Sequence, residues 1–423
     1  MANLITRSAN NVMDWVNERA PGMMPAYRKH MTEYFAPKNF NIWYIFGVLS
    51  IVVLVNQIVT GIFLTMHFKP SAAEAFASVE YIMRDVEWGW LIRYMHSTGA
   101  SLFFIVVYLH MFRGLMYGSY KKPRELVWLL GMVIYLVLMA EAFLGYVLPW
   151  GQMSYWGAKV IISLFGAIPV IGTGLTEWIM GDYNPGDATL NRFFALHVIA
   201  LPLVLLLLVV LHIGALHEVG SNNPDGIDIK KGPKGNRWSP TAPADGIPFH
   251  PYYTVKDSFY VGAFLILAAF IIFFAPAFGG WFLEHDNFTE ANQLVTPELI
   301  KPVWYFTPYY AMLRVVPSFF GIKLWGVLVM FGAIVVLFLV PWLDKSPVRS
   351  YRYRGLLSKA MLGMFVVCFL WLGKIGAGHG TDPIEAIIGR VLTFLYFAFF
   401  ITMPVWTKID KTKPVPERVT MHD

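Results

Sequence analysis

Two pairs of histidines, each inside a hydrophobic run long enough to cross a membrane, constrain this chain more than any other feature. His96 and His110 lie fourteen positions apart in one run, and His197 and His212 lie fifteen apart in another. In a helix that rises about 1.5 Å per residue, each pair spans roughly 21 to 22 Å, so one histidine lies near each face of the bilayer. Two such helices side by side would present two stacked pairs of imidazoles. The pattern predicts two bis-histidine haems, one above the other, and electron transfer across the membrane.

The composition indicates that the chain crosses the membrane several times. Of its 423 residues, 57% are hydrophobic and only 14% are charged, which excludes an ordinary soluble globular protein. Eight apolar stretches are long enough to form transmembrane helices. They are Trp43–Met66, Leu91–Met116, Leu126–Leu148, Phe193–Leu216, Phe259–Phe278, Leu324–Leu343, Leu356–Leu372 and Ile384–Trp406. The shorter Val160–Ile171 is bounded by glycine and proline, so we expect an interfacial helix pair there.

The distribution of Lys and Arg predicts the orientation of these helices. With eight spans, the two termini and the loops on their side carry most of the Lys and Arg outside the helices. Positive residues accumulate on the cytoplasmic side, so both termini are expected in the cytoplasm. The net charge of +6 then reflects these loops, and we expect no nucleic-acid partner. Residues 1–41 show no signal-peptide pattern, so we expect the first helix to direct insertion.

The orientation assigns the histidines to two layers. The second and fourth helices run in the same direction, which pairs His96 with His197 near the outer face and His110 with His212 near the inner face. A lone buried histidine is often a packing residue or part of a proton path, but four at nearly equal spacing favour two haem irons. The fifteen-residue interval needs a local bulge, which Pro202 permits because it lacks a backbone N–H.

Two pairs of glycines repeat the histidine interval. Gly47 and Gly61 are fourteen apart in the first helix, and Gly131 and Gly145 are fourteen apart in the third. Glycine in a membrane helix usually lets another helix approach, and the edge of a flat porphyrin requires the same absence of a side chain. We therefore expect an all-α membrane protein with eight transmembrane helices, of which the first four form a four-helix bundle around two haems. Because the chain has a single cysteine, Cys368, these haems must be held without thioether attachment.

The expected organisation has five parts. These are an N-terminal cytoplasmic segment with an amphipathic helix (1–41), the dihaem four-helix bundle (42–217), a cytoplasmic loop (218–254), a C-terminal four-helix transmembrane domain (255–406) and a cytoplasmic tail (407–423).

Five long strings of residues are specific enough to point to a family. They are RYMHSTGAS at Arg93–Ser101, GYVLPWGQMSYWGA at Gly145–Ala158, RFFALH at Arg192–His197, GSNNPDGI at Gly220–Ile227 and FHPYYTVKD at Phe249–Asp257. From about Asn39 to Trp406 the chain resembles cytochrome b, the membrane-embedded core of the cytochrome bc complex (respiratory Complex III). Its single continuous chain with eight helices argues against the chloroplast counterpart, which is split in two, and favours a bacterial protein of the inner membrane.

The resemblance implies a quinol–cytochrome c reductase. Such an enzyme oxidises ubiquinol at an outer site and sends one electron to a Rieske iron–sulfur protein. The other electron crosses two non-covalent b-type haems to an inner quinone site, with proton translocation. The resemblance also implies a c-type cytochrome subunit, membrane lipid and a homodimer as partners.

Site residues follow from the same motifs. The outer quinol site maps onto Gly145–Ala158, onto the loop helices around Lys159–Trp178 and onto Pro302, Trp304 and Tyr305. Tyr155 and Tyr305 could alternatively be interfacial belt aromatics. The inner site maps onto His217, Ser221 and Asp257, whose side chains exchange protons. Arg93 and Arg113, each three residues from a ligand histidine, resemble the partners of the haem propionates, although such arginines also snorkel.

One motif departs from the family. The Pro-Glu-Trp-Tyr motif commonly has glutamate where this chain has Val303, and in the family that carboxylate is thought to accept a proton from quinol. Glu298 is nearby in a loop, where we expect it to be solvated. Glu141 lies deep in the third helix, where an ionisable group is a functional candidate. We therefore favour Glu141 as the relocated proton acceptor, against a structural, hydrogen-bonded glutamate.

Two other functions remain open from the residues. A dihaem b-type membrane anchor of a dehydrogenase or hydrogenase would keep the four histidines but lack the motifs of the second half. A transporter with buried histidines would be expected to show an internal repeat and broken helices, and the sequence has neither feature.

Overall fold

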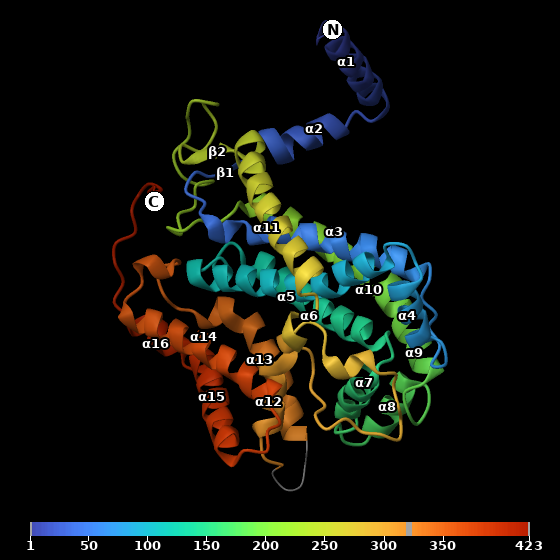
Figure 1. Cartoon of the computed structure of the whole chain (residues 1–423). Helices are drawn as coiled ribbons and strands as arrows, with labels where there is room; N and C mark the ends of the chain where they lie inside the picture. The colour runs from blue at the N-terminus through green and yellow to red at the C-terminus, as the bar shows by residue number, and fades with distance from the viewer. Residues whose placement is uncertain (1, 319–323, 422–423) are drawn as a thin grey trace.

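The computed structural model describes residues 2–318 and 324–421 and is mostly helical (Figure 1). In this part of the chain, 8 helices are long and apolar enough to cross a membrane. They are Ile42–Thr65 (with α3, Phe46–Thr65), Gly89–Tyr117 (α5), Glu125–Val147 (α6), Asp187–Val219 (with α9, Asp187–Ala195, and α10, Leu201–Val219), Phe249–Phe274 (with α11, Thr254–Phe274), Leu324–Leu343 (α13), Leu356–Ala377 (α14) and Pro383–Ile401 (α15). The predicted all-α, multi-pass architecture is confirmed.

Shorter elements connect these helices or lie at their ends. They are α1 (Ala2–Arg19), α2 (Met23–Tyr27), α4 (Ala75–Arg84), α7 (Gln152–Phe165), α8 (Gly172–Met180), α12 (Thr307–Val315), α16 (Met403–Ile409), β1 (Phe35–Pro37), β2 (Gly246–Pro248) and the single turns η1 (Arg28–Thr32), η2 (Ile42–Tyr44), η4 (Phe249–Tyr253), η5 (Phe278–Gly280), η6 (His285–Phe288), η7 (Trp304–Phe306) and η9 (Tyr351–Tyr353). The apolar stretch at Val160–Ile171 is divided between the end of α7 and the turn before α8. It therefore belongs to a short helix pair, as predicted, and not to a ninth span.

The first four spans pack in two tight pairs, α3 against α5 and α6 against α10. Apolar side chains drive this packing, and glycine ends two of these helices, α5 at Gly118 and α10 at Gly220. Gly118, with φ of 64°, ends α5 in the left-handed conformation that glycine adopts readily. The helices α12, α13, α14 and α15 form a second group. Between the two groups the indole N–H of Trp128 on α6 donates to the carbonyl of Leu337 on α13, at 2.8 Å.

The fourth span contains the bulge expected from its fifteen-residue histidine interval. Residues Leu196–Ala200 form a π-helical turn, η3, between α9 and α10. A π turn accommodates one residue more than an α turn, and Pro202 follows at once, where it cannot donate a backbone hydrogen bond. The turn includes His197, and it lets both histidines of this span face the bundle.

The two terminal segments meet on the same side of the bundle. Strands β1 and β2 pair antiparallel and join the segment before α3 to the loop before α11. In that loop the carboxylate of Asp245 binds Lys38 at 3.0 Å and Arg418 at 2.8 Å. Burial alone would raise the pKa of Asp245, but the hydrogen bonds from Arg418 and Lys38 bring that pKa well below its usual range. Residues near both ends of the chain bind this one carboxylate, so the two ends lie on the same side of the bundle. An even number of spans requires this arrangement.

Candidate functional site

The four histidines predicted as ligands form two pairs inside the bundle. The ring centroids are 6.2 Å apart for His96 and His197 and 6.4 Å apart for His110 and His212. Two imidazoles that share one metal through bonds of about 2 Å, with each centroid about 1 Å behind its nitrogen, would be separated by about 6 Å. The observed spacing therefore fits one iron between the rings of each pair. Within the described residues no group of three His, Cys, Asp or Glu could hold a metal ion, so a porphyrin would have to supply the remaining ligands.

Each of the four predicted glycines faces one of these histidines. A Cβ added to Gly47 would lie 3.4 Å from Cε1 of His110, and one added to Gly61 would lie 3.3 Å from Cε1 of His96. The other two glycines, on α6, face the histidines of the fourth span. A Cβ at Gly131 would lie 3.2 Å from Cε1 of His212, and one at Gly145 would lie 2.9 Å from Nε2 of His197 and closer still to Cε1. The missing side chains thus leave space beside each imidazole, where a flat group bound to that ring would extend.

The two predicted arginines lie beside the histidines of α5. Nη2 of Arg113 is 3.2 Å from Nδ1 of His110, and the guanidinium lies 5.0 Å from the centroid of the Tyr44 ring. Its buried Nε has no hydrogen-bond partner. Arg93 is half-buried one turn before His96. A haem propionate bound here would give the unpaired Nε of Arg113 a hydrogen-bond acceptor beside the predicted ligand His110.

Glu141 lies against His197, one of the predicted ligands. Its carboxylate Oε1 is 3.0 Å from Nδ1 of His197, and its own backbone carbonyl is 2.9 Å from the same nitrogen. The other carboxylate oxygen is buried without a partner. Oxygen acceptors on the ring nitrogen that does not face the metal orient a ligating imidazole and raise its basicity. This geometry favours a role for Glu141 at the haem ligand.

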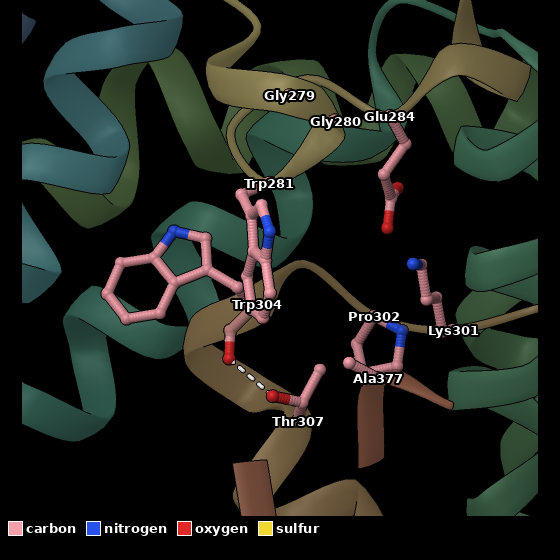
Figure 2. A pocket seen from close by; sticks show the side chains of 9 residues that line it. All are labelled: Gly279, Gly280, Trp281, Glu284, Lys301, Pro302, Trp304, Thr307 and Ala377. Atoms are coloured by element: carbon pink, nitrogen blue, oxygen red, sulfur yellow. Dashed lines mark hydrogen bonds between the residues drawn. The ribbon is translucent and has the colours of Figure 1, made fainter. Parts of the chain in front are cut away.

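A cavity of about 190 Å³ lies at the motif that contains Val303. Figure 2 shows the side chains around it. Its lining comprises Gly279, Gly280, Trp281, Glu284, Lys301, Pro302, Trp304, Thr307 and Ala377. The walls of the cavity are therefore formed by the loop after α11, the motif that contains Val303 and the end of α14. Pro302 and Trp304 are the two predicted outer-site residues that line it.

The other predicted outer-site residues, Tyr305 and Tyr155, are buried and do not line the cavity. Tyr305 stacks on Phe104 with centroids 3.9 Å apart, and its backbone carbonyl accepts a hydrogen bond from the hydroxyl of Tyr108 at 2.6 Å. Tyr155 is 1% exposed and packs against Trp150. Val303 is 4% exposed and belongs to the hydrophobic core. Glu298 is exposed, as predicted.

Sequence reasoning missed Glu284, the one carboxylate that lines this cavity. It is 8% exposed and accepts a hydrogen bond from the hydroxyl of Tyr146 on α6. Burial raises the pKa of Glu284 to about 7, although the Tyr146 O–H and the nearby Lys301 ammonium act in the opposite direction. A glutamate in a loop carries no sequence signal that distinguishes it from a solvated one.

The inner-site candidates lie near the end of α10 (His217 and Ser221) and in the first turn of α11 (Asp257). Nδ1 of His217 is 2.9 Å from Nδ1 of His30, and the ring of His217 stacks on Tyr34 at 4.2 Å. Tyr34 also contacts Phe249, in the turn that leads into α11 and its half-buried Asp257. Ser221 lies just beyond the end of α10, where its carbonyl accepts from Arg124 at 3.4 Å. His30 and Tyr34 were not predicted, because they lie far from His217 in sequence.

Comparisons with known proteins assign the chain to a family. The family model described as cytochrome b/b6/petB matches residues 31–220, and the model described as cytochrome b(C-terminal)/b6/petD matches residues 290–397. Together the two models cover more than half of the chain. The chain belongs to the cytochrome b family, whose members bind b-type haem and interact with quinone.

Individual relatives extend the match over nearly the whole chain. Cytochrome b of Allochromatium vinosum is 61% identical over 96% of this chain and 98% of its own length. The cytochrome b/c1 protein of Bradyrhizobium diazoefficiens is 46% identical over 97% of this chain and 57% of its own length. Among solved structures, a chain of a hyperthermophilic respiratory Complex III has a TM-score of 0.85 and 39% identity, covering 94% of this chain and 98% of that one.

Proposed function

We propose that this protein is the cytochrome b subunit of a ubiquinol–cytochrome c oxidoreductase of a bacterial inner membrane, with both termini in the cytoplasm. The observation that carries the proposal is that four imidazoles form two facing pairs, one near each end of the same bundle. Their ring centroids are 6.2 Å apart in one pair and 6.4 Å apart in the other. Two b-type haems bound there would supply one-electron transfer from one face of the membrane to the other.

In this proposal the chain's own residues hold those groups and handle protons. His96 and His197 would ligate the outer haem, and His110 and His212 the inner one. The glycines opposite them leave space for the porphyrin, and Arg113 and Arg93 would bind propionates. At the outer site Pro302 and Trp304 would form the wall against which quinol binds, with Tyr305 packed against Trp304, and the buried Tyr155 would contribute from α7.

At the inner site His217, Asp257 and Ser221 would bind the quinone head and deliver protons to it. His30 supports this assignment because its hydrogen bond to His217 holds the imidazole in one orientation. Two imidazoles that share a proton through their Nδ1 atoms can pass it on when the quinone takes one.

The proposed partners are a Rieske iron–sulfur protein and a c-type cytochrome, in a complex that is homodimeric and embedded in lipid. The similarity to a chain of a respiratory Complex III and to a relative named cytochrome b/c1 supports them.

A purified complex tests the proposal directly. We expect a reduced-minus-oxidised spectrum with two b-type haems, co-purification of a Rieske protein and a c-type cytochrome, and reduction of cytochrome c that depends on added ubiquinol. Membership of the cytochrome b family argues against a transporter. Two b haems without quinol-dependent cytochrome c reduction, and without a Rieske partner, would favour a dihaem anchor and refute the proposal.

A further inference from the structure

The motif that contains Val303 presents no carboxylate to the outer cavity. The Val303 side chain is 4% exposed, lies in the hydrophobic core and is not part of the cavity lining. Of the other acids considered, Glu298 is exposed to solvent and Glu141 contacts His197 inside the bundle. Glu284 is the acid of this region that lines the cavity beside Pro302 and Trp304.

Long-range contacts fix the loop that carries Glu284. Gly279 and Gly280 take φ angles of 63° and 86°, so the chain turns sharply after α11. The following residues bind the segment after α6: the backbone N–H of Ser154 donates to the side chain of Asn287 at 2.9 Å, and that of Gln152 donates to the carbonyl of Thr289 at 2.9 Å. These bonds hold the loop in place beside Tyr146.

The carboxylate has one hydrogen-bond donor, and two charged side chains lie near it. From α6 the Tyr146 hydroxyl donates to Oε2 of Glu284. Lys301 faces it from the segment before the motif, and Asp286 lies near it within its own loop. Figure 2 shows the carboxylate pointing toward Lys301 and into the cavity, across from Pro302 and Trp304. The hydroxyl of the buried Tyr305 is the remaining titratable group that interacts with Glu284.

We propose that Glu284 accepts the proton that the bound quinol releases at the outer site, in place of the carboxylate that Val303 lacks. The proposal rests on the proposed function, because it needs quinol in this cavity. Oxidation of the quinol to quinone releases two electrons and two protons. The O–H bond of one quinol hydroxyl breaks and its proton forms an O–H bond with the Glu284 carboxylate, while the other hydroxyl loses its proton to water. The electrons leave the quinol for the Rieske protein and the outer haem, and Glu284 then releases the proton to water.

The environment of Glu284 suits this exchange. A base must be ionised before quinol reacts and must then hold the proton briefly, which is most effective when its pKa is near the working pH. Burial raises the pKa of Glu284 to about 7, and the remaining 8% exposure leaves a way out to water. The Tyr146 hydroxyl and Lys301 favour the ionised form, so Glu284 is available as a base at neutral pH.

Three variants of the complete purified complex test this proposal. In Glu284→Gln we expect ubiquinol-dependent reduction of cytochrome c to slow by about 10- to 100-fold, because positioned general bases contribute about 10²- to 10⁴-fold. The rise of the rate with pH around pH 7 should disappear, while both b haems remain. Glu298→Gln is the matched control, with the same change at an exposed position, and should keep the wild-type rate.

Tyr146→Phe keeps the test decisive if Glu284→Gln does not assemble. The phenol stabilises the ionised carboxylate, so its removal should raise the pKa of Glu284 and move the acid limb of the pH–rate profile to higher pH. An unshifted limb, or a Glu284→Gln enzyme with wild-type rate and pH profile, refutes the proposal. A Glu284→Gln enzyme that is slow but keeps the wild-type pH profile also refutes it, because Glu284 then has only a structural role. If instead the wild-type complex fails to oxidise quinol, the proposed function itself is wrong.

Discussion

The glycines beside the histidines give the most quantitative test of the haem assignment. In Gly145→Ala the new Cβ would lie 2.9 Å from Nε2 of His197 and closer still to Cε1, whereas in Gly47→Ala it would lie 3.4 Å from Cε1 of His110. Favourable contacts between heavy atoms are about 3.5 to 4.0 Å, so the ring of His197 would have to move by on the order of 1 Å. The ring of His110 would have to move only slightly.

Overpacking of this kind costs about 1 to 3 kcal/mol. At about 1.4 kcal/mol for each factor of ten, Gly145→Ala should weaken retention of the outer haem by about 5- to 150-fold, and Gly47→Ala should leave the inner haem nearly unchanged. Gly61→Ala and Gly131→Ala, with Cβ distances of 3.3 and 3.2 Å, should fall between these two.

The assay is the b-haem content per purified complex together with redox-resolved difference spectra. His96→Leu and His212→Leu provide reference spectra for complexes that lack the outer or the inner haem. Equal haem loss in Gly145→Ala and Gly47→Ala, or loss of the inner signal in Gly145→Ala, would refute the proposal that these glycines leave space for the haems.

Three further predictions use other contacts. His212→Leu should remove the inner haem or leave it five-coordinate while the outer spectrum is kept, and loss of only the outer spectrum would refute the layer assignment. Asp257→Asn should slow reoxidation of the inner haem by quinone in stopped-flow measurements and spare the first phase of quinol oxidation; equal slowing of both phases would count against an inner site there. Asp344 and Arg354 form an ion pair at 2.5 Å with both side chains 0% exposed, so Asp344→Asn should destabilise the protein by about 3 to 5 kcal/mol and lower its thermal unfolding temperature. Burial alone would raise the pKa of Asp344, but Arg354, Lys121 and Tyr120 lower it overall. The ion pair should therefore stabilise the protein at neutral pH and lose this effect only as the pH falls through the lowered pKa. Unchanged stability in Asp344→Asn would refute this role of the pair.

The sequence predicted the features of this protein that repeat along a helix. Spans of apolar residues are local, so their number could be read from the chain, and the positions of His96 and His110 followed from the rise of a single helix. The bulge in the fourth span was also predictable, because a fifteen-residue interval does not fit whole turns and Pro202 lies inside it. The structure places this bulge at Leu196–Ala200.

Features that depend on contacts between distant segments could not be predicted in this way. His30 and His217 are 187 positions apart, and no periodic pattern connects an N-terminal segment with the end of the fourth span. The position of Glu284 depends on two glycines with positive φ and on hydrogen bonds to residues that lie more than a hundred positions earlier. The sequence therefore drew attention to Glu141, whose unusual position inside a helix is visible locally.

Glu141 and Glu284 show how environment separates the roles of two carboxylates. Glu141 touches His197 from the side away from the metal position, at 3.0 Å, where a carboxylate orients a ligand and increases its electron donation. Glu284 contacts no ligand histidine but reaches a cavity lined by the outer-site motif. Glu141→Gln should therefore raise the midpoint potential of the outer haem, because removal of a negative charge favours the reduced form, and it should keep the pH dependence of quinol oxidation. Loss of that pH dependence in Glu141→Gln, with an unchanged midpoint potential, would instead identify Glu141 as the proton acceptor. Each substitution is thus expected to change a different measurement: Glu141→Gln the redox titration, and Glu284→Gln the pH–rate profile.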